Sequence, residues 1–249
     1  MQSAKKAAFF FDLDNTLFDY EASFKKASLF AFHTITNNKW KDTPLVEKWF
    51  TYYKAYCDLY WSAYEKKEIS RQDYQRVRLL SSFEAIGLKS FCDAQIQYYQ
   101  KVFEKSVPSE VEPFEWIKEI FQRLDQLGIL IGIISNGDSI IQREKIKNLK
   151  LHIPEMNIYI SSEINVAKPN PDIFHFVKNC TNAEVYHYVG DAFDLDIVPA
   201  VQAGWNAIWW NPLKQPAAVN PSSIYNCTSS SDLIEVIKRC IESAGYSLH

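Results

Sequence analysis

The sequence predicts an α/β protein with a doubly wound parallel sheet and an all-helical domain inserted into it. Two observations lead to this prediction. Short apolar runs that do not alternate with polar residues recur along the chain, which is typical of strands buried on both faces of a parallel sheet. Segments with apolar residues at helical spacing separate these runs, so strands alternate with helices. One long segment near the N-terminus shows only the helical pattern.

Four apolar runs predict the central strands of the sheet, and each ends in polar residues. They are Ala7–Phe11, Ile129–Ile134, Val185–Val189 and Ala207–Trp210. Two further strands are expected at Ile158–Ile160 and Ile224–Cys227.

Helical spacing predicts three helices between these strands: Phe114–Leu127, Pro171–Asn179 and Asp196–Ala203. A glycine follows the first and the third helix, as expected where the backbone turns left-handed after a helix end. Asn170 precedes the second helix as a candidate N-cap residue, with Pro171 at the first helical position.

The segment from about residue 21 to residue 105 contains one glycine and one proline, and its apolar residues recur at helical spacing. It therefore predicts a helical domain of residues 19–107, inserted into a core formed by residues 1–18 and 108–249. An aromatic stripe lies at helical spacing within it: Trp49, Tyr53, Tyr56, Tyr60 and Tyr64. Such a stripe either packs the core of the inserted domain or lines a substrate cleft.

Composition narrows the class of function. The net charge of -3 gives no electrostatic footprint for a nucleic acid polymer or an anionic membrane. The five cysteines show no CxxC spacing, which favours free thiols in a reducing compartment. No run approaches the roughly 20 apolar residues of a membrane span, and the apolar run near the N-terminus is too short for a signal peptide. We expect a cytoplasmic protein.

Polar groups follow three of the predicted strands at the point where each strand ends. Asp12 and Asp14 follow the first, Ser135 and Asn136 the second, and Asp191 the third. Because the carboxyl ends of parallel strands share one edge of the sheet, where ligands of open α/β sheets bind, these groups are expected to converge.

The residue types suit phosphoryl transfer. A carboxylate such as Asp12 can attack phosphorus, and an acid two residues on can protonate the leaving oxygen. Asp191 adds an oxygen ligand of the kind that Mg²⁺ prefers. Ser135 can donate a hydrogen bond to phosphoryl oxygens, and Lys168 can neutralise their charge. Taken singly, each residue is compatible with a turn, a helix cap or a solvated surface position. Their order along the chain is what favours a site.

Four motifs resemble those of the haloacid dehalogenase (HAD) superfamily of phosphohydrolases. They are FDLDNTLFD at Phe11–Asp19, ISNGD at Ile134–Asp138, KPNPDIF at Lys168–Phe174 and VGDAFDLDI at Val189–Ile197. The resemblance implies a Rossmann-like core, and the position of the insertion resembles the C1-type helical cap of subfamily I.

The resemblance also implies roles at the matching positions. Asp12 would be the nucleophile and a metal ligand, and Asp14 the general acid and base with its carbonyl oxygen on Mg²⁺. Ser135 and Asn136 would bind phosphate, and Lys168 would stabilise the developing charge.

Within the fourth motif, the resemblance makes Asp191 a Mg²⁺ ligand and Asp196 a supporting acid near the metal and the lysine. Leu195 stands where the family often has Asn. Asp14 argues against dehalogenation, because family dehalogenases lack an acid there. The segment Asp-Asn-Thr-Leu at Asp14–Leu17, with Asn15 where many relatives have Gly, resembles that of the pyrimidine 5′-nucleotidase and sialic-acid 9-phosphate phosphatase branches.

The expected partner is therefore a small phosphorylated metabolite, with a slight preference for nucleoside 5′-monophosphates. Sugar or sugar-acid phosphate hydrolysis, a phosphomutase and a non-enzymatic binding protein on the same scaffold are the alternatives. The chain is expected to be a monomer or a homodimer.

Overall fold

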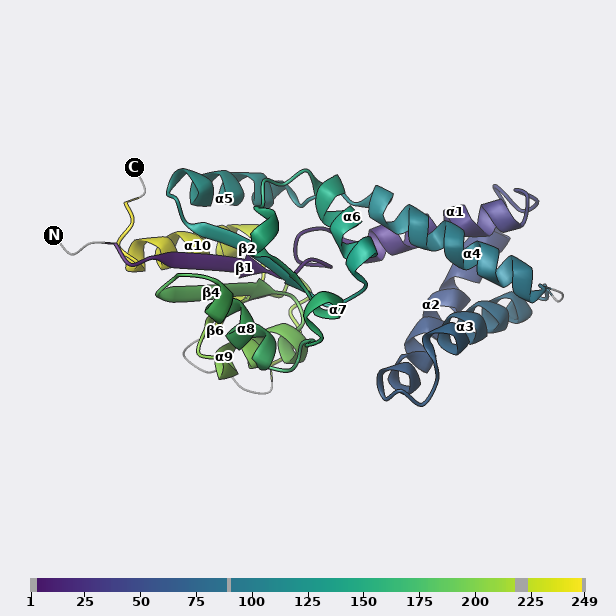
Figure 1. Cartoon of the computed structure of the whole chain (residues 1–249). Helices are drawn as coiled ribbons and strands as arrows, with labels where there is room; N and C mark the ends of the chain where they lie inside the picture. The colour runs from purple at the N-terminus through teal and green to yellow at the C-terminus, as the bar shows by residue number, and fades with distance from the viewer. Residues whose placement is uncertain (1–3, 89–90, 218–223, 248–249) are drawn as a thin grey trace. The chain divides into compact units, whose positions relative to one another are not determined.

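The computed structural model describes residues 4–88, 91–217 and 224–247. The chain divides into two compact units. One, the α/β unit, is formed by Met1–Tyr20 and Val111–His249, and the other, the helical unit, by Glu21–Glu110 (Figure 1).

The α/β unit is built on a parallel sheet in which the strands follow the order β3-β2-β1-β4-β5-β6. The strands are β1 (Ala7–Phe11), β2 (Leu130–Ser135), β3 (Ile158–Ile160), β4 (Val185–Gly190), β5 (Asn206–Trp210) and β6 (Ile224–Cys227). The order reverses around β1, so the sheet is doubly wound as predicted. Phe11 pairs with Ile133 of β2 and with Val189 of β4, so these three strands end at nearly the same level.

Helices cover both faces of the sheet. Helices α5 (Glu115–Gln126) and α10 (Ser230–Ser243) lie on one face, and α8 (Asp172–Cys180) and α9 (Val198–Gln202) on the other (Figure 1). Each face has its own buried apolar cluster, the first including Ile117 and the second Phe174. Burial on both faces is the physical reason for the continuous apolar runs of the strands.

All six predicted strands are present within one or two residues of their expected ends, and two of the predicted helices begin and end close to the predicted positions. The third predicted helix, Asp196–Ala203, begins later than predicted, at Val198. A π-helical turn occupies Phe193–Ile197, and α9 starts only after it. Val198 N donates to the carbonyl of Phe193, five residues earlier, which widens the turn.

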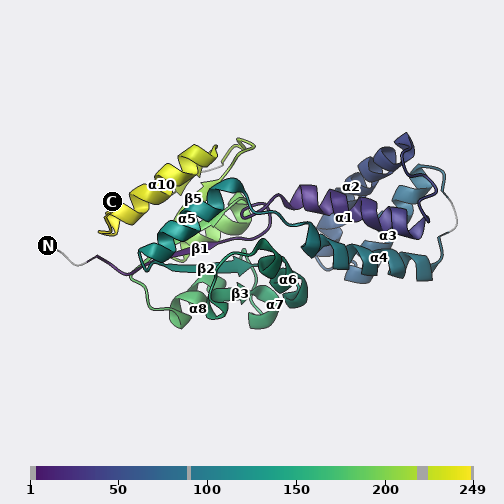
Figure 2. The same cartoon turned by 90° about the horizontal axis from the view of Figure 1, so that it is seen from above.

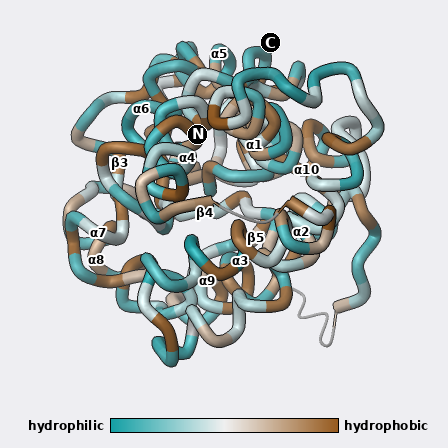
Figure 3. Tube along the Cα trace, turned by 90° about the vertical axis from the view of Figure 1, so that its right-hand side faces the viewer, coloured by the Kyte–Doolittle hydropathy of each residue, from teal (hydrophilic) through white to brown (hydrophobic). Residues whose placement is uncertain are grey.

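The helical unit contains α2 (Pro44–Glu65), α3 (Arg71–Ala85), α4 (Asp93–Ser106) and all of α1 (Tyr20–Ile35) except Tyr20, which belongs to the α/β unit (Figure 2). Of the aromatic stripe, Trp49 and Tyr53 are fully buried and stack on each other, so they pack the core of this unit. Tyr56 and Tyr60 are half-buried and stack on each other instead. Hydrophobic stretches alternate with hydrophilic ones along the coloured part of the trace (Figure 3).

The two chain crossings between the units are tied together at their base. Phe18, on the way out of the α/β unit, forms bridges with both Asp14 and Pro113. Phe114 N donates to the carbonyl of Leu17 at 3.1 Å. The backbone that follows the Asp12–Asp14 motif is therefore held by Pro113 and Phe114, in the segment where the chain re-enters the α/β unit.

Two expectations from composition have structural counterparts. All five cysteines are free thiols. In the described parts of the chain, no helix has both the length and the apolar character needed to cross a lipid bilayer.

One buried histidine lies in the middle of the sheet. His187 of β4 stacks on Phe9 with ring centroids 4.4 Å apart, and among the described residues neither ring nitrogen has a hydrogen-bond partner. Burial lowers the pKa of His187 to about 4 from its ordinary 6.5. The unfolded chain therefore binds a proton at this residue at a higher pH than the folded chain does.

We predict that His187 contributes to the loss of stability in acid. A depressed pKa in the folded state means that stability is lost as the pH falls from about 6.5 towards about 4. At pH 5 this residue should cost about 2 kcal/mol relative to pH 7.5. Urea unfolding of His187→Leu should show a smaller difference between the two pH values than the wild type. His152→Leu, at an exposed position, is the control. An unchanged pH dependence in His187→Leu would contradict the assignment.

Candidate active site

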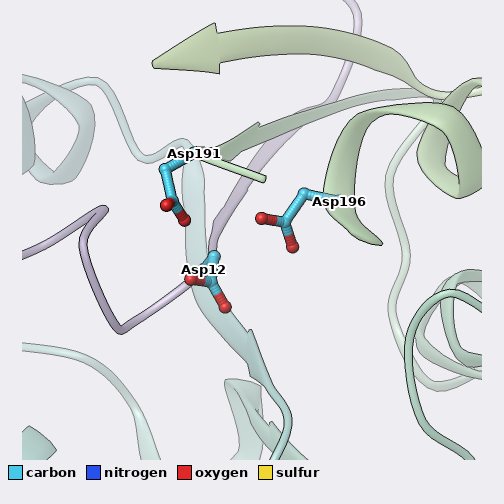
Figure 4. A group of neighbouring side chains, drawn as sticks. All are labelled: Asp12, Asp191 and Asp196. Carbon is cyan, nitrogen blue, oxygen red and sulfur yellow. The ribbon is translucent and has the colours of Figure 1, made fainter. Parts of the chain in front are cut away.

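Two aspartates lie side by side at the carboxyl edge of the sheet. Asp12 directly follows β1 and Asp191 directly follows β4, and Asp12 N donates to the carbonyl of Val189 at 2.8 Å. Asp196, from the π-helical turn, brings a third carboxylate, and one oxygen from each lies within 4.8 Å of the others. Figure 4 shows the three carboxylates pointing towards one another. The predicted convergence of the ends of β1 and β4 is therefore confirmed.

A buried lysine, Lys168, contacts two of these three carboxylates. Lys168 Nζ lies 2.5 Å from Asp12 Oδ1 and 2.6 Å from Asp196 Oδ1. It also donates to the hydroxyl of Tyr188 at 2.9 Å. Burial alone would lower the pKa of Lys168, but the charges of Asp12 and Asp196 raise it above its ordinary value. These two carboxylates therefore favour the charged form of Lys168.

Gly190 allows Asp196 to approach. A Cβ atom at residue 190 would lie 2.6 Å from the Cβ of Asp196, closer than real contacts allow. The π-helical turn brings the Asp196 carboxylate back onto its own backbone, where Oδ2 accepts from Ala192 N at 3.0 Å. The glycine before Asp191 is thus required by packing, and the sequence pattern did not reveal this reason.

The site carries more negative than positive charge. Burial raises the pKa of Asp12 above its ordinary value, and Lys168 only partly offsets this. Burial, together with the charge of Asp196, raises the pKa of Asp191 to about 7. Three carboxylates around one ammonium group form an environment that would be stabilised by a further cation.

The donor atoms fit a hard divalent cation such as Mg²⁺. Asp196 already binds Lys168, Tyr188 and the backbone of Ala192, so its oxygens are engaged. Asp12 and Asp191 remain as the carboxylates that could hold the ion, in agreement with the preference of Mg²⁺ for one or two carboxylates and several waters. Trp209 Nε1 donates to the carbonyl of Asp191 at 2.8 Å and so fixes its backbone.

The end of β2 enters the site through Ser135 and Asn136, and the side-chain amide of Asn136 binds the backbone of Lys168. It accepts from Lys168 N at 3.0 Å and donates to the carbonyl of Lys168 at 2.8 Å. Because this side chain is engaged with backbone, any contact with phosphate would come from the Asn136 main chain. Gly137 N donates to Ser161 Oγ at 3.0 Å, at the start of α7 (Ser161–Ile164).

Asp14 has two partners that the sequence did not indicate. They come from α6 (Ser139–Leu149): Lys145 contacts both carboxylate oxygens, and Gln142 contacts one of them. Gln142 also donates to Ser135 Oγ at 2.7 Å. Gln142 and Lys145 are three residues apart, but this spacing is too common in sequences to single these residues out.

The seven residues singled out from the sequence all lie in the α/β unit. The contacts above connect Asp12, Lys168 and Asp196 directly, Asp191 through its neighbouring carboxylates, and Asn136 through the backbone of Lys168. Ser135 and Asp14 are connected with each other through Gln142.

Comparison with known proteins assigns the chain to a family. The pattern of the haloacid dehalogenase-like hydrolases matches residues 9–210, which include every residue of the site described above. The chain therefore belongs to the haloacid dehalogenase-like hydrolases.

Relatives within this family are distant. The chain is 22% identical to "Putative HAD-hydrolase YfnB" of Bacillus subtilis over 91% of this chain and 93% of that protein. It is 24% identical to "Pyrimidine 5'-nucleotidase YjjG" of Escherichia coli over 86% of this chain and 90% of that protein. A magnesium-bound crystal structure of YfnB matches with a TM-score of 0.71 at 20% identity, covering 94% of this chain and 99% of that chain. A 2-haloacid dehalogenase from Pseudomonas syringae matches with a TM-score of 0.56 at 23% identity, covering 95% and 99%.

Proposed function

We propose that the protein hydrolyses small phosphate monoesters with Mg²⁺, through an aspartyl phosphate on Asp12. The observation that carries this proposal is that buried Asp12 lies beside half-buried Asp191 and is bound to Lys168, with a further acid, Asp14, two residues after Asp12. Phosphate monoester hydrolysis is among the slowest uncatalysed reactions. A site for it needs a nucleophile, a proton donor and concentrated positive charge.

In the first step, a carboxylate oxygen of Asp12 attacks phosphorus, and the bond from phosphorus to the ester oxygen breaks. Asp14 gives its proton to that oxygen, which leaves as an alcohol. The ammonium group of Lys168, the hydroxyl of Ser135 and the main-chain N–H of Asn136 would stabilise the phosphoryl oxygens.

In the second step, Asp14 takes a proton from water, and the water oxygen attacks the phosphorus of the aspartyl phosphate. The bond between phosphorus and the Asp12 oxygen breaks, so inorganic phosphate leaves and both aspartates return to their starting states. One group thus serves as acid and then as base.

Mg²⁺ would be held by the carboxylates of Asp12 and Asp191 and the main-chain carbonyl of Asp14. Bound there, the ion neutralises charge on the phosphoryl group and on the crowded carboxylates. Its binding would also stabilise the ionised form of Asp191, which is otherwise unfavourable because burial raises the pKa of this carboxyl group to about 7.

The helical unit is proposed to act as a cap. It is inserted directly after the Asp12–Asp14 motif, a position from which closure could exclude bulk water and select small substrates. Asp14 favours a substrate whose leaving oxygen needs a proton over a haloacid, whose halide leaves without one. The similarity to YjjG favours nucleoside 5′-monophosphates among such esters.

The nucleophile assignment predicts the behaviour of Asp12→Asn. Because an amide cannot form the acyl phosphate, kcat for p-nitrophenyl phosphate should fall at least about a hundredfold with the fold retained. Beryllofluoride with Mg²⁺ should raise the Tm of the wild type, because it mimics the phosphorylated carboxylate, and should not raise that of the variant. Activity above about a hundredth of the wild-type value would refute the assignment.

The metal assignment predicts a magnesium-dependent Tm. Mg²⁺ binds the folded state alone, so it should raise the Tm of the wild type by mass action, and EDTA should stop turnover reversibly. Asp191→Asn should lose this shift. Its metal-free form should be at least as stable as the wild type above pH 7, because the ionised carboxylate, with its pKa raised to about 7, is unfavourable there. The exposed Asp194, in the same turn, provides the control Asp194→Asn. A full Mg²⁺ shift in Asp191→Asn would contradict the site.

The substrate preference predicts at least about a tenfold higher kcat/KM for deoxythymidine or uridine 5′-monophosphate than for ribose 5-phosphate. The base would add binding energy that is used at the reacting phosphate. Release of inorganic phosphate, measured for each ester, distinguishes hydrolysis from phosphomutase activity. A higher kcat/KM for N-acetylneuraminate 9-phosphate would replace the nucleotide by a sugar-acid phosphate.

A further inference from the structure

Helix α6 directs two buried polar side chains at Asp14. Gln142 and Lys145 are three residues apart, so they lie on the same face of the helix. Their exposed fractions are only 2% and 3%. A buried lysine is uncommon unless it has a charged partner, which makes the position of its ammonium group informative.

The ammonium group of Lys145 is centred on the Asp14 carboxylate. Nζ lies 2.8 Å from Oδ1 and 2.9 Å from Oδ2, so both oxygens are held by one cation. Gln142 Nε2 adds a third contact, at 3.2 Å from Oδ2. Three contacts from one helix face define the rotation of the carboxylate as well as its position.

The surroundings of Lys145 restrict it to this location. Its Nζ lies 4.7 Å from the ring centroid of Tyr20 and 5.9 Å from that of Phe18, within the range of cation–π attraction. The aromatic rings lie on the chain segment that follows Asp14. The lysine thus binds the acid and packs against the backbone segment that carries it.

The orientation of α6 is fixed from its N-terminus. Asp138 accepts from Ile140 N at 3.1 Å and Ile141 N at 3.3 Å as the N-cap residue. Arg143 pairs with Glu163 of α7 through Nε at 2.6 Å and NH2 at 2.8 Å. These contacts keep the opposite face of the helix outward and Lys145 inward.

We propose that Lys145 is a positioning residue for the general acid and base, Asp14. This inference rests on the proposed function. Lys145 holds both oxygens of the ionised Asp14 and one oxygen of its protonated form, which leaves the other oxygen to give its proton to the leaving group. Gln142 ties this orientation to Ser135. Two other roles would give different results: a purely structural ion pair, and a cation that binds substrate phosphate directly.

The test compares two esters that differ in their need for a proton. An alkyl phosphate such as glycerol 2-phosphate needs protonation of its leaving oxygen, whereas p-nitrophenolate leaves without it. The ratio kcat/KM reports the steps up to departure of the leaving group. In the full-length chain, Lys145→Met should lower kcat/KM for the alkyl ester about 10- to 100-fold. This is less than the roughly 10²–10⁴-fold effect of general acid catalysis, because Asp14 itself is still present. The value for p-nitrophenyl phosphate should fall less than about threefold.

Matched variants separate the possible roles. Lys145→Arg, which keeps the cation, should recover most of the loss, and Lys147→Met, at an exposed lysine of the same helix, should match the wild type. In an Asp14→Asn background, Lys145→Met should have no further effect on the ratio between the two esters, because its partner is gone. If Lys145→Met does not fold, Lys145→Gln, which removes the charge but keeps a polar side chain, replaces it in the same comparison of the two esters.

Two outcomes would overturn the inference. Equal losses on both esters would indicate a structural ion pair. A raised inhibition constant for inorganic phosphate, with KM raised for both esters, would indicate direct phosphate binding. An inactive wild type would instead count against the proposed function, so the two failures are distinguishable.

Discussion

The shared ammonium group of Lys168 is the interaction on which the rest of the site depends. It joins Asp12, at the end of β1, to Asp196, in the turn after β4, and it is almost completely buried. Removing one member of such a group leaves an uncompensated buried charge, which costs roughly 3–5 kcal/mol. Three segments that are far apart in the sequence are therefore held together by charges that are stable only in one another's presence.

The charges of this arrangement do not cancel, and the excess is negative. One lysine does not neutralise three carboxylates, and burial together with the neighbouring carboxylates raises the pKa values of Asp12 and Asp191. The folded chain tolerates this cost at one edge of a sheet whose two apolar clusters supply the stability. A site that is unfavourable in charge without a cation is suited to binding one, so the local cost and the proposed activity have a single origin.

The sequence predicted the features that depend on local pattern and on sheet topology. Runs of buried residues located the strands, and the shared edge of a parallel sheet brought Asp12 and Asp191 together. The contacts of Asp14 with Gln142 and Lys145 were not predictable, because they depend on the rotation of α6 about its axis, which Asp138 and Arg143 set through hydrogen bonds. Tyr188 was hidden in another way, since its hydroxyl lies within an apolar run and no pattern distinguishes it from packing residues. The π-helical turn was not predictable either, because it depends on the contact of Asp196 with Lys168, which exists only in the folded chain.

Asn136 shows how such a site is made rigid. Its amide binds both the N–H and the carbonyl of Lys168, so the end of β2 holds the main chain of the lysine while the aspartates hold its ammonium group. A long flexible side chain anchored at both ends loses most of its rotational freedom on folding rather than on binding a ligand. The charged groups are thus held in position in the folded chain before a ligand binds. Charges that are positioned in advance stabilise a transition state most effectively.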